Sequence, residues 1–351
     1  MSINKKIILF SIGLTIANSI FSQDFTFSQY EEMPMLQNPA FAGSSSDDIK
    51  VASGYRSQWA SITVPFETIT LSVEANILLN DDDFITIGTQ LIKDQAGDSK
   101  LSRTQAEPVV CFHKCLDGEN GNKSGNYLSF SIMGGLVQSQ FDPTTLTFDD
   151  QFVAGHFDPL NPTQAVLKKT SISYIDGSAG LSFTSGTSDG SSGSNFNYYL
   201  GAACYHLLKP NVSYFDYDNN QLKQRFVLNA GCSKLNSGNN NRVYFYGDYI
   251  IQGGARQFLS SVLYSKNIQG DRDETSSKIF FGAAYRWADA LVPILKLKKV
   301  SENNEMLIGV SYDFNISKLR TASQYRGGLE ITASFQKKFS RDMPCPRLRA
   351  N

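Results

Sequence analysis

Residues 196–205 read Phe-Asn-Tyr-Tyr-Leu-Gly-Ala-Ala-Cys-Tyr, and every second side chain from Phe196 to Cys204 is apolar or aromatic. Successive side chains of a β-strand point to opposite faces, so this segment has one apolar face and one mixed face with small and polar side chains. A soluble sandwich would show the same alternation, so one such segment does not decide between fold classes.

The same alternation recurs along most of the chain. It is clearest in Leu128-Phe130-Ile132, in Phe226-Leu228-Ala230 and in Met306-Ile308-Val310-Tyr312. The pattern predicts about fourteen strands, at residues 49–59, 67–79, 84–93, 101–115, 126–137, 172–183, 195–207, 225–234, 242–251, 257–267, 278–287, 290–299, 304–315 and 327–339. Within 290–299, Pro293 removes a donor from the hydrogen-bond ladder, so we expect a bulged strand there.

The N-terminus has the features of an export signal. Lys5 and Lys6 precede an apolar run over residues 7–16, and small residues then lead to a predicted cut between Ser22 and Gln23. The run is too short for a membrane anchor, which needs about 20 apolar residues, and no later stretch approaches that length. Alternating strands behind an export signal predict an all-β fold, a transmembrane antiparallel barrel in the outer membrane.

Charge and length fit this class. Without residues 1–22 the chain has 30 basic and 33 acidic residues, a net charge of −3, which argues against a nucleic-acid partner. We divide the sequence into a signal peptide (1–22), a pre-barrel segment (23–46), the barrel (47–340) and a periplasmic tail (341–351).

The predicted connections suggest an orientation. The set at 81–83, 185–194, 236–241 and 300–303 is expected to be periplasmic, and the longer 141–171 and 209–224 are expected to be outer loops. Side chains fill a barrel of about eight strands, whereas 16–18 strands leave a channel. A barrel of intermediate size must therefore conduct or be plugged, by 141–171 or by 23–46. The latter contains Pro34 and Pro39, and we expect extended or turn-like structure in it.

Several stretches resemble the PorP/SprF family. They are Phe27-Ser28-Gln29-Tyr30, residues 36–43 (Leu-Gln-Asn-Pro-Ala-Phe-Ala-Gly), residues 55–59 (Tyr-Arg-Ser-Gln-Trp), 281–290, 309–319, 326–331 and Cys345-Pro346-Arg347. The resemblance implies an outer-membrane protein of the type IX secretion and gliding-motility apparatus, which exports or anchors surface adhesins that carry a type B C-terminal domain. On these motifs the candidate partner-binding or structural residues are Tyr30, Asn38, Pro39, Tyr55, Arg56, Trp59, Arg286, Asp289, Arg326 and Cys345.

The resemblance therefore implies a non-enzymatic barrel without cofactor or metal. Its expected partners are the adhesin's C-terminal domain, periplasmic type IX secretion components and outer-membrane lipid. The alternative is a channel for hydrophobic or small solutes, because Asn38-Pro39-Ala40 resembles the N-terminal plug of fatty-acid channels. A hydrolase built around His156 is disfavoured, since no nucleophile elbow accompanies it.

Other chemically suggestive residues have simpler interpretations. Cys111, His113 and Cys115 share one face of a strand about 6.5–7 Å apart, a spacing that suits zinc poorly, so we expect a bulged or lipid-facing strand end. Cys204 and Cys232 are expected on the apolar face of neighbouring strands.

Three further residues are assigned by their place in or beside a predicted strand. His206 is expected at a membrane interface, and Trp287 in an aromatic girdle. Trp59 fits either a girdle or a latch that faces the lumen beside Arg56.

Overall fold

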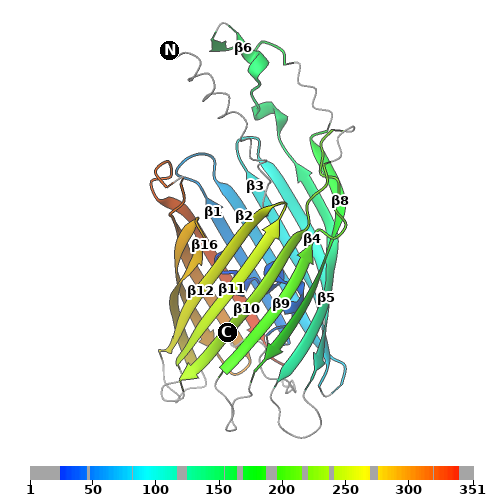
Figure 1. Ribbon diagram of the computed structural model, residues 1–351, viewed down its shortest axis with the longest axis vertical. Helices are drawn as coiled ribbons and strands as arrows, with labels where there is room; N and C mark the ends of the chain where they lie inside the picture. Colours follow the sequence, from blue (N-terminus) through cyan, green and yellow to red (C-terminus); the bar gives the residue numbers. More distant parts are fainter. Residues whose placement is uncertain are drawn as a thin grey trace, which may run out of the picture.

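The computed structural model describes residues 24–45, 48–80, 82–116, 125–153, 155–163, 169–186, 196–215, 220–236, 241–268, 276–318 and 320–339. Within these residues, fourteen strands form a closed antiparallel barrel (Figure 1). The barrel strands are β1 (Ile49–Gln58), β2 (Phe66–Leu78), β3 (Phe84–Ala96), β4 (Leu101–Cys115), β5 (Asn126–Gln140), β8 (Ser171–Ser185), β9 (Phe196–Tyr205), β10 (Arg225–Asn236), β11 (Asn241–Gln252), β12 (Ala255–Asn267), β13 (Ser276–Arg286), β14 (Ala290–Val300), β15 (Asn304–Asn315) and β16 (Arg326–Lys337). The predicted strands are confirmed.

The barrel closes where its first and last strands pair. Strand β1 runs antiparallel to β16 from Ile49 opposite Lys337 to Gln58 opposite Gly328. Each barrel strand from β1 to β15 also pairs with the barrel strand that follows it in the sequence, so the fold is an up-and-down barrel. No helix among the described residues is long and apolar enough to cross a membrane.

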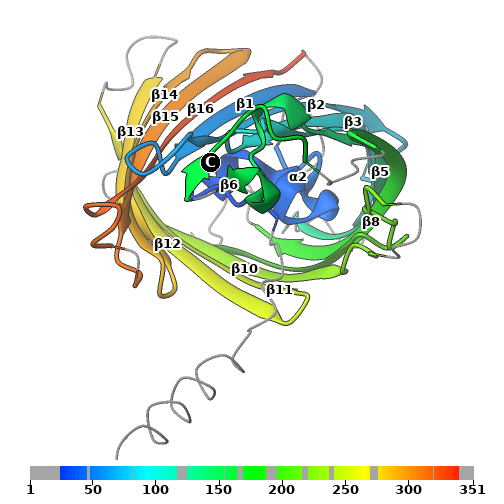
Figure 2. The same cartoon turned by 90° about the horizontal axis from the view of Figure 1, so that it is seen from above.

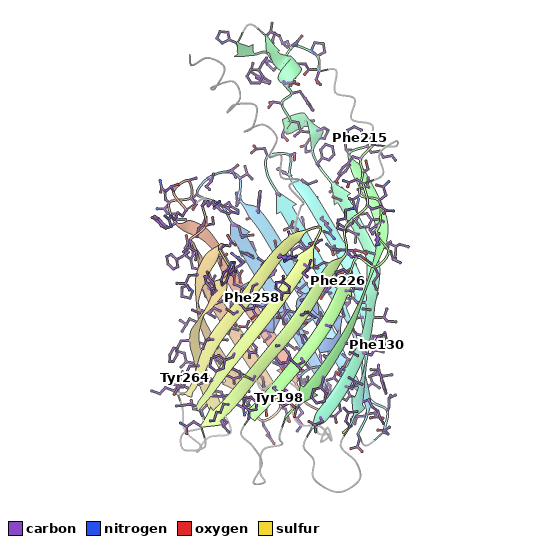
Figure 3. The ribbon with its side chains drawn as sticks, viewed as in Figure 1. Phe130, Tyr198, Phe215, Phe226, Phe258 and Tyr264 are labelled. Carbon is purple, nitrogen blue, oxygen red and sulfur yellow. The ribbon has the colours of Figure 1, made fainter. Side chains whose placement is uncertain are left out.

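Alternation separates an apolar outer surface from a polar lumen. In β15 the side chains of Met306 and Ile308 are exposed on the outside, whereas those of Ser311 and Asp313 are buried toward the lumen. Figure 3 shows the same outward direction for the labelled aromatic residues Phe130, Tyr198, Phe226, Phe258 and Tyr264. An apolar band outside and polar groups inside are what a barrel in lipid requires.

The connections lie at two opposite ends of the barrel. We call the end at the top of Figure 1 the loop rim; it carries the connections 59–65, 97–100, 141–170, 206–224, 253–254, 287–289 and 316–325. The opposite end, the turn rim, carries the other connections, and the barrel both begins and ends there. The two predicted sets of connections therefore do lie at opposite ends.

Strand β14 is regular, so the bulge expected at Pro293 was wrong. Pro293 lies opposite Ala283 of β13 in an unbroken register. On the other side the pairs Leu291–Phe314 and Ile294–Ser311 keep equal spacing. A proline loses one ladder hydrogen bond but does not require an extra residue, and the strand accommodates it in this way.

Residues 24–45, here called the N-terminal segment, lie inside the barrel (Figure 2). They form three short helical turns, η1 (Tyr30–Glu32), α2 (Pro34–Gln37) and η2 (Pro39–Phe41). Pro34 and Pro39 start α2 and η2, where the fixed φ of proline suits the first helical position. The expected turns are present, but the α-helical turn was not anticipated.

The other plug candidate lies elsewhere. The described part of the 141–170 connection stands beyond the loop rim (Figure 1). It contains η3 (Pro143–Thr145), η4 (Asp149–Gln151) and a hairpin of β6 (Phe152–Val153) and β7 (His156–Phe157). The described residues of this connection therefore do not fill the lumen.

Candidate functional site

The N-terminal segment passes along the lumen from one rim toward the other. Its first described residue, Asp24, pairs with Arg103 near the loop rim, at 2.9 Å from Nη1 to Oδ1. Farther along, the backbone N–H of Gly43 donates to Glu74 of β2 at 2.9 Å, close to the turn rim where β1 begins. The segment thus enters at the loop rim and joins the barrel wall at the turn rim.

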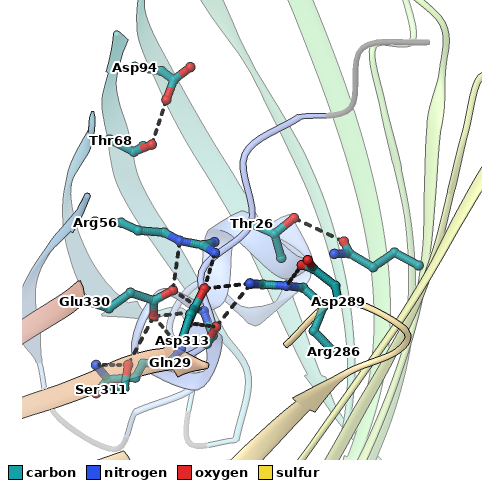
Figure 4. A network of polar contacts seen from close by, with 12 residues as sticks. Thr26, Gln29, Arg56, Thr68, Asp94, Arg286, Asp289, Ser311, Asp313 and Glu330 are labelled. Carbon is teal, nitrogen blue, oxygen red and sulfur yellow. Dashed lines mark hydrogen bonds and ion pairs between the residues drawn. The ribbon is translucent and has the colours of Figure 1, made fainter. Parts of the chain in front are cut away.

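A buried charged network holds the first part of the segment (Figure 4). Arg56 of β1 contacts Asp313 of β15 at 2.7 Å and Glu330 of β16 at 3.2 Å. Arg286 of β13 also contacts Asp313, at 2.6 Å, and pairs with Asp289 just beyond its own strand. Four of the five side chains are almost completely removed from water, and only Asp289 is partly exposed. Buried charges of this kind are tolerated because each has an opposite charge beside it.

The segment completes this network with its backbone. The N–H groups of Ser28 and Gln29 donate to the two carboxylate oxygens of Glu330 at 2.8 and 3.1 Å. The Ser28 hydroxyl accepts from Arg286 at 3.2 Å. The side-chain amide of Gln29 bridges Ser311 at 3.1 Å and Thr332 at 3.0 Å. Hydrogen bonds to an ionised carboxylate are roughly twice as strong as neutral ones, so Glu330 is a principal anchor of the segment.

A second buried cluster follows in η1. Lys296 of β14 pairs with both Glu31 and Glu32, with 2.8 Å to Glu32. Burial would raise the pKa of Glu32, but the neighbouring lysines, first Lys296 and then Lys50, outweigh it and lower that pKa below its usual value. Glu32 is therefore held as a carboxylate inside the lumen.

Asn38 fixes the middle of the segment. Its side-chain oxygen accepts from the N–H of Ala40 at 2.9 Å and caps η2. Its amide nitrogen donates to the Leu181 carbonyl of β8 at 3.1 Å and to Asn229 of β10 at 3.2 Å. A Cβ atom at Gly180 would lie 2.1 Å from the Asn38 oxygen, so only glycine leaves room for this contact.

His206 anchors the first described residue of the segment. It lies just after β9 with a φ of 59°, between the carboxylates of Asp24 and Asp176. Burial would lower the pKa of His206, but the two carboxylates outweigh burial and raise it to about 9. The pKa of Asp24 is correspondingly held well below its usual value, because Arg103 and His206 outweigh the opposing effect of its burial.

The family model for the type IX secretion system membrane protein PorP/SprF matches residues 19–335. The chain belongs to the PorP/SprF family. With its closed barrel and apolar outer band, this membership makes it an integral protein of the outer membrane. A search of curated proteins found no match.

Several solved barrels match this PorP/SprF chain at low sequence identity. The CymD monoaromatic hydrocarbon channel is 10% identical, with 92% of this chain and 96% of that chain covered and a TM-score of 0.49. A Pseudomonas aeruginosa FadL homologue is 8% identical, with the same coverage and TM-score. The translocator domain of the Neisseria meningitidis autotransporter NalP is 7% identical, with 89% and 96% coverage and a TM-score of 0.39.

The structure brings together six of the ten predicted PorP/SprF motif residues. Arg56, Arg286 and Asp289 share the charged network, while Asn38 and Pro39 lie in the segment itself. Tyr30 is also buried in the segment, with its ring 6.4 Å from that of Tyr246 and its hydroxyl 3.4 Å from Ser261.

The other four residues belong neither to the charged network nor to the segment. Tyr55 is on the outer surface, where its hydroxyl donates to Glu67 at 2.8 Å. Trp59, with a φ of 62°, follows β1 at the loop rim, and its N–H donates to the Gly327 carbonyl. Arg326 is exposed at the same rim, and Cys345 lies outside the described residues.

Asp313 and Glu330 were not among the predicted site residues, although both lie in quoted PorP/SprF motifs. They bear charge at lumen-facing positions of β15 and β16, between the outward residues Tyr312 and Phe314 and between Leu329 and Ile331. An acid in the lumen phase of a strand, opposite a motif arginine, was the signal that could have found them.

Two expectations about which way side chains face were wrong. Cys111 and His113 face the lumen, not the lipid: Cys111 contacts the Ala40 carbonyl, and His113 stacks on Phe84 with ring centroids 4.1 Å apart. His206 is buried against the segment and not at a membrane interface. The hydrophobic pattern misplaced these side chains because some lumen-facing residues of this PorP/SprF barrel pack on the segment and not against water.

The remaining expectations concern the cysteines, a metal and Trp287. Cys204 and Cys232 do lie outward on the neighbouring strands β9 and β10. Among the described residues, no cluster of His, Cys, Asp and Glu side chains could hold a metal ion. Trp287 is exposed beside Tyr285 at the loop rim, where an aromatic girdle is expected.

Proposed function

We propose that this PorP/SprF protein is a non-enzymatic docking platform in the outer membrane. It anchors, or helps to export, a type IX secreted surface adhesin through the adhesin's type B C-terminal domain. The observation that carries the proposal is that the barrel's own N-terminal segment occupies the lumen, held by ion pairs and hydrogen bonds to buried charged side chains of β13, β14, β15 and β16. Family membership supplies the secretion context.

In this proposal the N-terminal segment is a plug. A pore that opened readily would need to release the segment, and this would leave Lys296 and Glu330 without the partners that the segment supplies. Truncating one member of a buried ion pair costs about 3–5 kcal/mol, and several are present here. A closed, rigid barrel fits an anchor better than a solute channel.

With the lumen occupied, the partner would contact the rims. Arg326, a family-motif residue, is exposed on the loop rim, whereas Arg56 and Arg286 are buried in the network. We therefore assign the buried motif residues to holding the plug and Arg326 to the docking surface. Periplasmic secretion components would meet the turn rim, where β1 begins and β16 ends.

The test is adhesin retention in cells together with co-purification of the tagged barrel. Arg326→Ala should reduce surface adhesin at normal barrel levels, and Arg256→Ala, exposed at the start of β12 on the same rim, is the matched control. Wild-type barrel should co-purify with the adhesin in mild detergent. A barrel that never co-purifies with adhesin and that conducts solutes when reconstituted would replace this proposal with the channel alternative.

A further inference from the structure

In the described part of the 141–170 connection, several apolar side chains lie beyond the loop rim and face water, not lipid. Four of them, Phe152, Val153, Phe157 and Leu160, are 58%, 49%, 42% and 89% exposed. They lie beyond the loop rim in Figure 1, and Figure 3 shows that this part of the chain stands well above the labelled lipid-facing residues. We call residues 146–163 the loop knob.

The loop knob is held by its polar groups. Asp150 accepts from Asn161 through its carbonyl at 2.6 Å and from Thr163 through its carboxylate at 3.0 Å. Gln151 closes η4 by accepting from the Phe148 N–H at 3.0 Å, and its carbonyl accepts from the Asp158 N–H at 2.9 Å. Hydrogen bonds inside and apolar side chains outside are the reverse of the usual arrangement in a water-exposed loop.

The stem fixes where this surface stands. The Asp142 N–H donates to the Ser99 carbonyl at 2.7 Å, and the Thr145 hydroxyl donates to the Asp98 carbonyl at 3.1 Å. The ring of Phe141 also packs edge-on against Tyr214, with centroids 5.0 Å apart. The loop knob is therefore tied to two neighbouring connections of the loop rim and presents its apolar face in a set direction.

Its charge indicates the chemistry of what covers it. Residues 146–163 contain three aspartates, Asp149, Asp150 and Asp158, and no lysine or arginine. Asp149 and Asp158 are exposed next to the apolar side chains, whose aromatic members Phe152 and Phe157 lie 5.7 Å apart. Apolar groups surrounded by charge of one sign are typical of a protein interface whose partner has the opposite sign.

We propose that the loop knob is a docking surface for a protein that presents an apolar pocket surrounded by lysine and arginine side chains. Phe152 and Phe157 are the anchors, because buried aromatic residues dominate such interfaces. Asp149 and Asp158 select and orient the partner. The inference rests on the proposed function only for the partner's identity, which would be the adhesin's C-terminal domain.

Protection of a single cysteine tests this surface in living cells. Leu160→Cys is labelled with a bulky membrane-impermeant maleimide on intact adhesin-producing cells and on the purified barrel, with the unsubstituted chain as background. Thr63→Cys, exposed in the 59–65 connection of the same rim, is the accessible control. Folding of each variant is checked by heat-modified gel mobility.

The inference predicts that position 160 reacts fully in the purified barrel and at least tenfold more slowly on cells, while position 63 reacts in both. Adding Phe152→Ser with Phe157→Ser, or Asp149→Lys with Asp158→Lys, should restore labelling on cells. Equal labelling of 160 in both samples would overturn the inference. Protection already present in the purified barrel, or loss of labelling at both positions on cells, would overturn it too.

The two proposals fail separately. If position 160 stays protected in cells that lack the adhesin, the loop knob is a docking surface for another basic protein, and the proposed function is decided separately by adhesin retention and co-purification. If the adhesin is retained while position 160 is freely labelled, the proposed function stands and this inference falls. If protection survives the aspartate-to-lysine changes, the basic partner is wrong.

Discussion

At the scale of single residues, Glu330 has the largest predicted effect on the segment. It accepts two backbone N–H groups of the segment and faces Arg56, so Glu330→Gln leaves a buried arginine partly uncompensated. We expect a loss of about 3–5 kcal/mol in the stability of this region. Hydrogen exchange should become at least tenfold faster at Ser28 and Gln29 while the barrel strands stay protected.

The control for this change is Glu302→Gln, since Glu302 is exposed in the connection between β14 and β15 at the turn rim. It should leave exchange at Ser28 and Gln29 unchanged. Unchanged exchange in Glu330→Gln as well would show that the charged network does not hold the segment.

His206 gives a pH dependence with a definite sign. Its pKa is raised from 6.5 to about 9, so its contribution is complete below about pH 6.5 and is lost as the pH rises through 9. The shift corresponds to on the order of 3 kcal/mol. Asp24 acts at the other end: its pKa is lowered, so its contribution is present above about pH 4 and is lost only in stronger acid.

Urea unfolding of the barrel at pH 6 and pH 10 measures this effect. Wild type should lose more stability than His206→Gln over this interval, because glutamine keeps polar contacts but does not titrate. Other groups titrate equally in both proteins, so an identical loss would show that His206 does not stay protonated between Asp24 and Asp176.

At the scale of elements, the N-terminal segment keeps the lumen closed. Deleting residues 24–45 should leave a folded but less stable barrel, because the segment contributes no strand to the sheet and water entering the lumen would offset part of the cost of the unpaired charges. The barrel without residues 24–45 should conduct ions in planar bilayers, whereas the wild-type barrel should conduct little. A deleted barrel that folds but stays closed would contradict the assignment of the segment as the plug.

The barrel strands could be predicted from the sequence because each repeats a period of two over ten or more residues. Hairpin β6–β7 could not, since two-residue strands such as Phe152–Val153 have no period. The number of strands implied either a plug or a channel, but the hydrophobic pattern of the sequence did not indicate which of the two candidate segments is the plug. That choice depends on Glu330 and Asp313, whose partners in the segment are hundreds of residues away in the sequence. It also depends on Gly180, which matters because it has no side chain.

At the scale of the whole molecule, the two rims predict an orientation. The barrel begins and ends at the turn rim, which we expect to be periplasmic, and the loop rim should face the exterior. Thr63→Cys should therefore react with an impermeant maleimide on intact cells, and Glu302→Cys only after the outer membrane is permeabilised. The reverse labelling pattern would show that the barrel has the opposite orientation and that the loop knob lies in the periplasm.

The contact of Ser28 and Gln29 with β16 also bears on how the protein is assembled. Strands β1 and β16 are the two ends of the sheet, and Arg56 lies directly opposite Glu330 where they join. That join brings together residues 270 or more positions apart, the kind of contact that forms late in folding. The segment binds the same glutamate, so we expect the segment to enter the lumen as β1 and β16 pair. A newly made barrel would then be closed from the moment it is complete and would never leak.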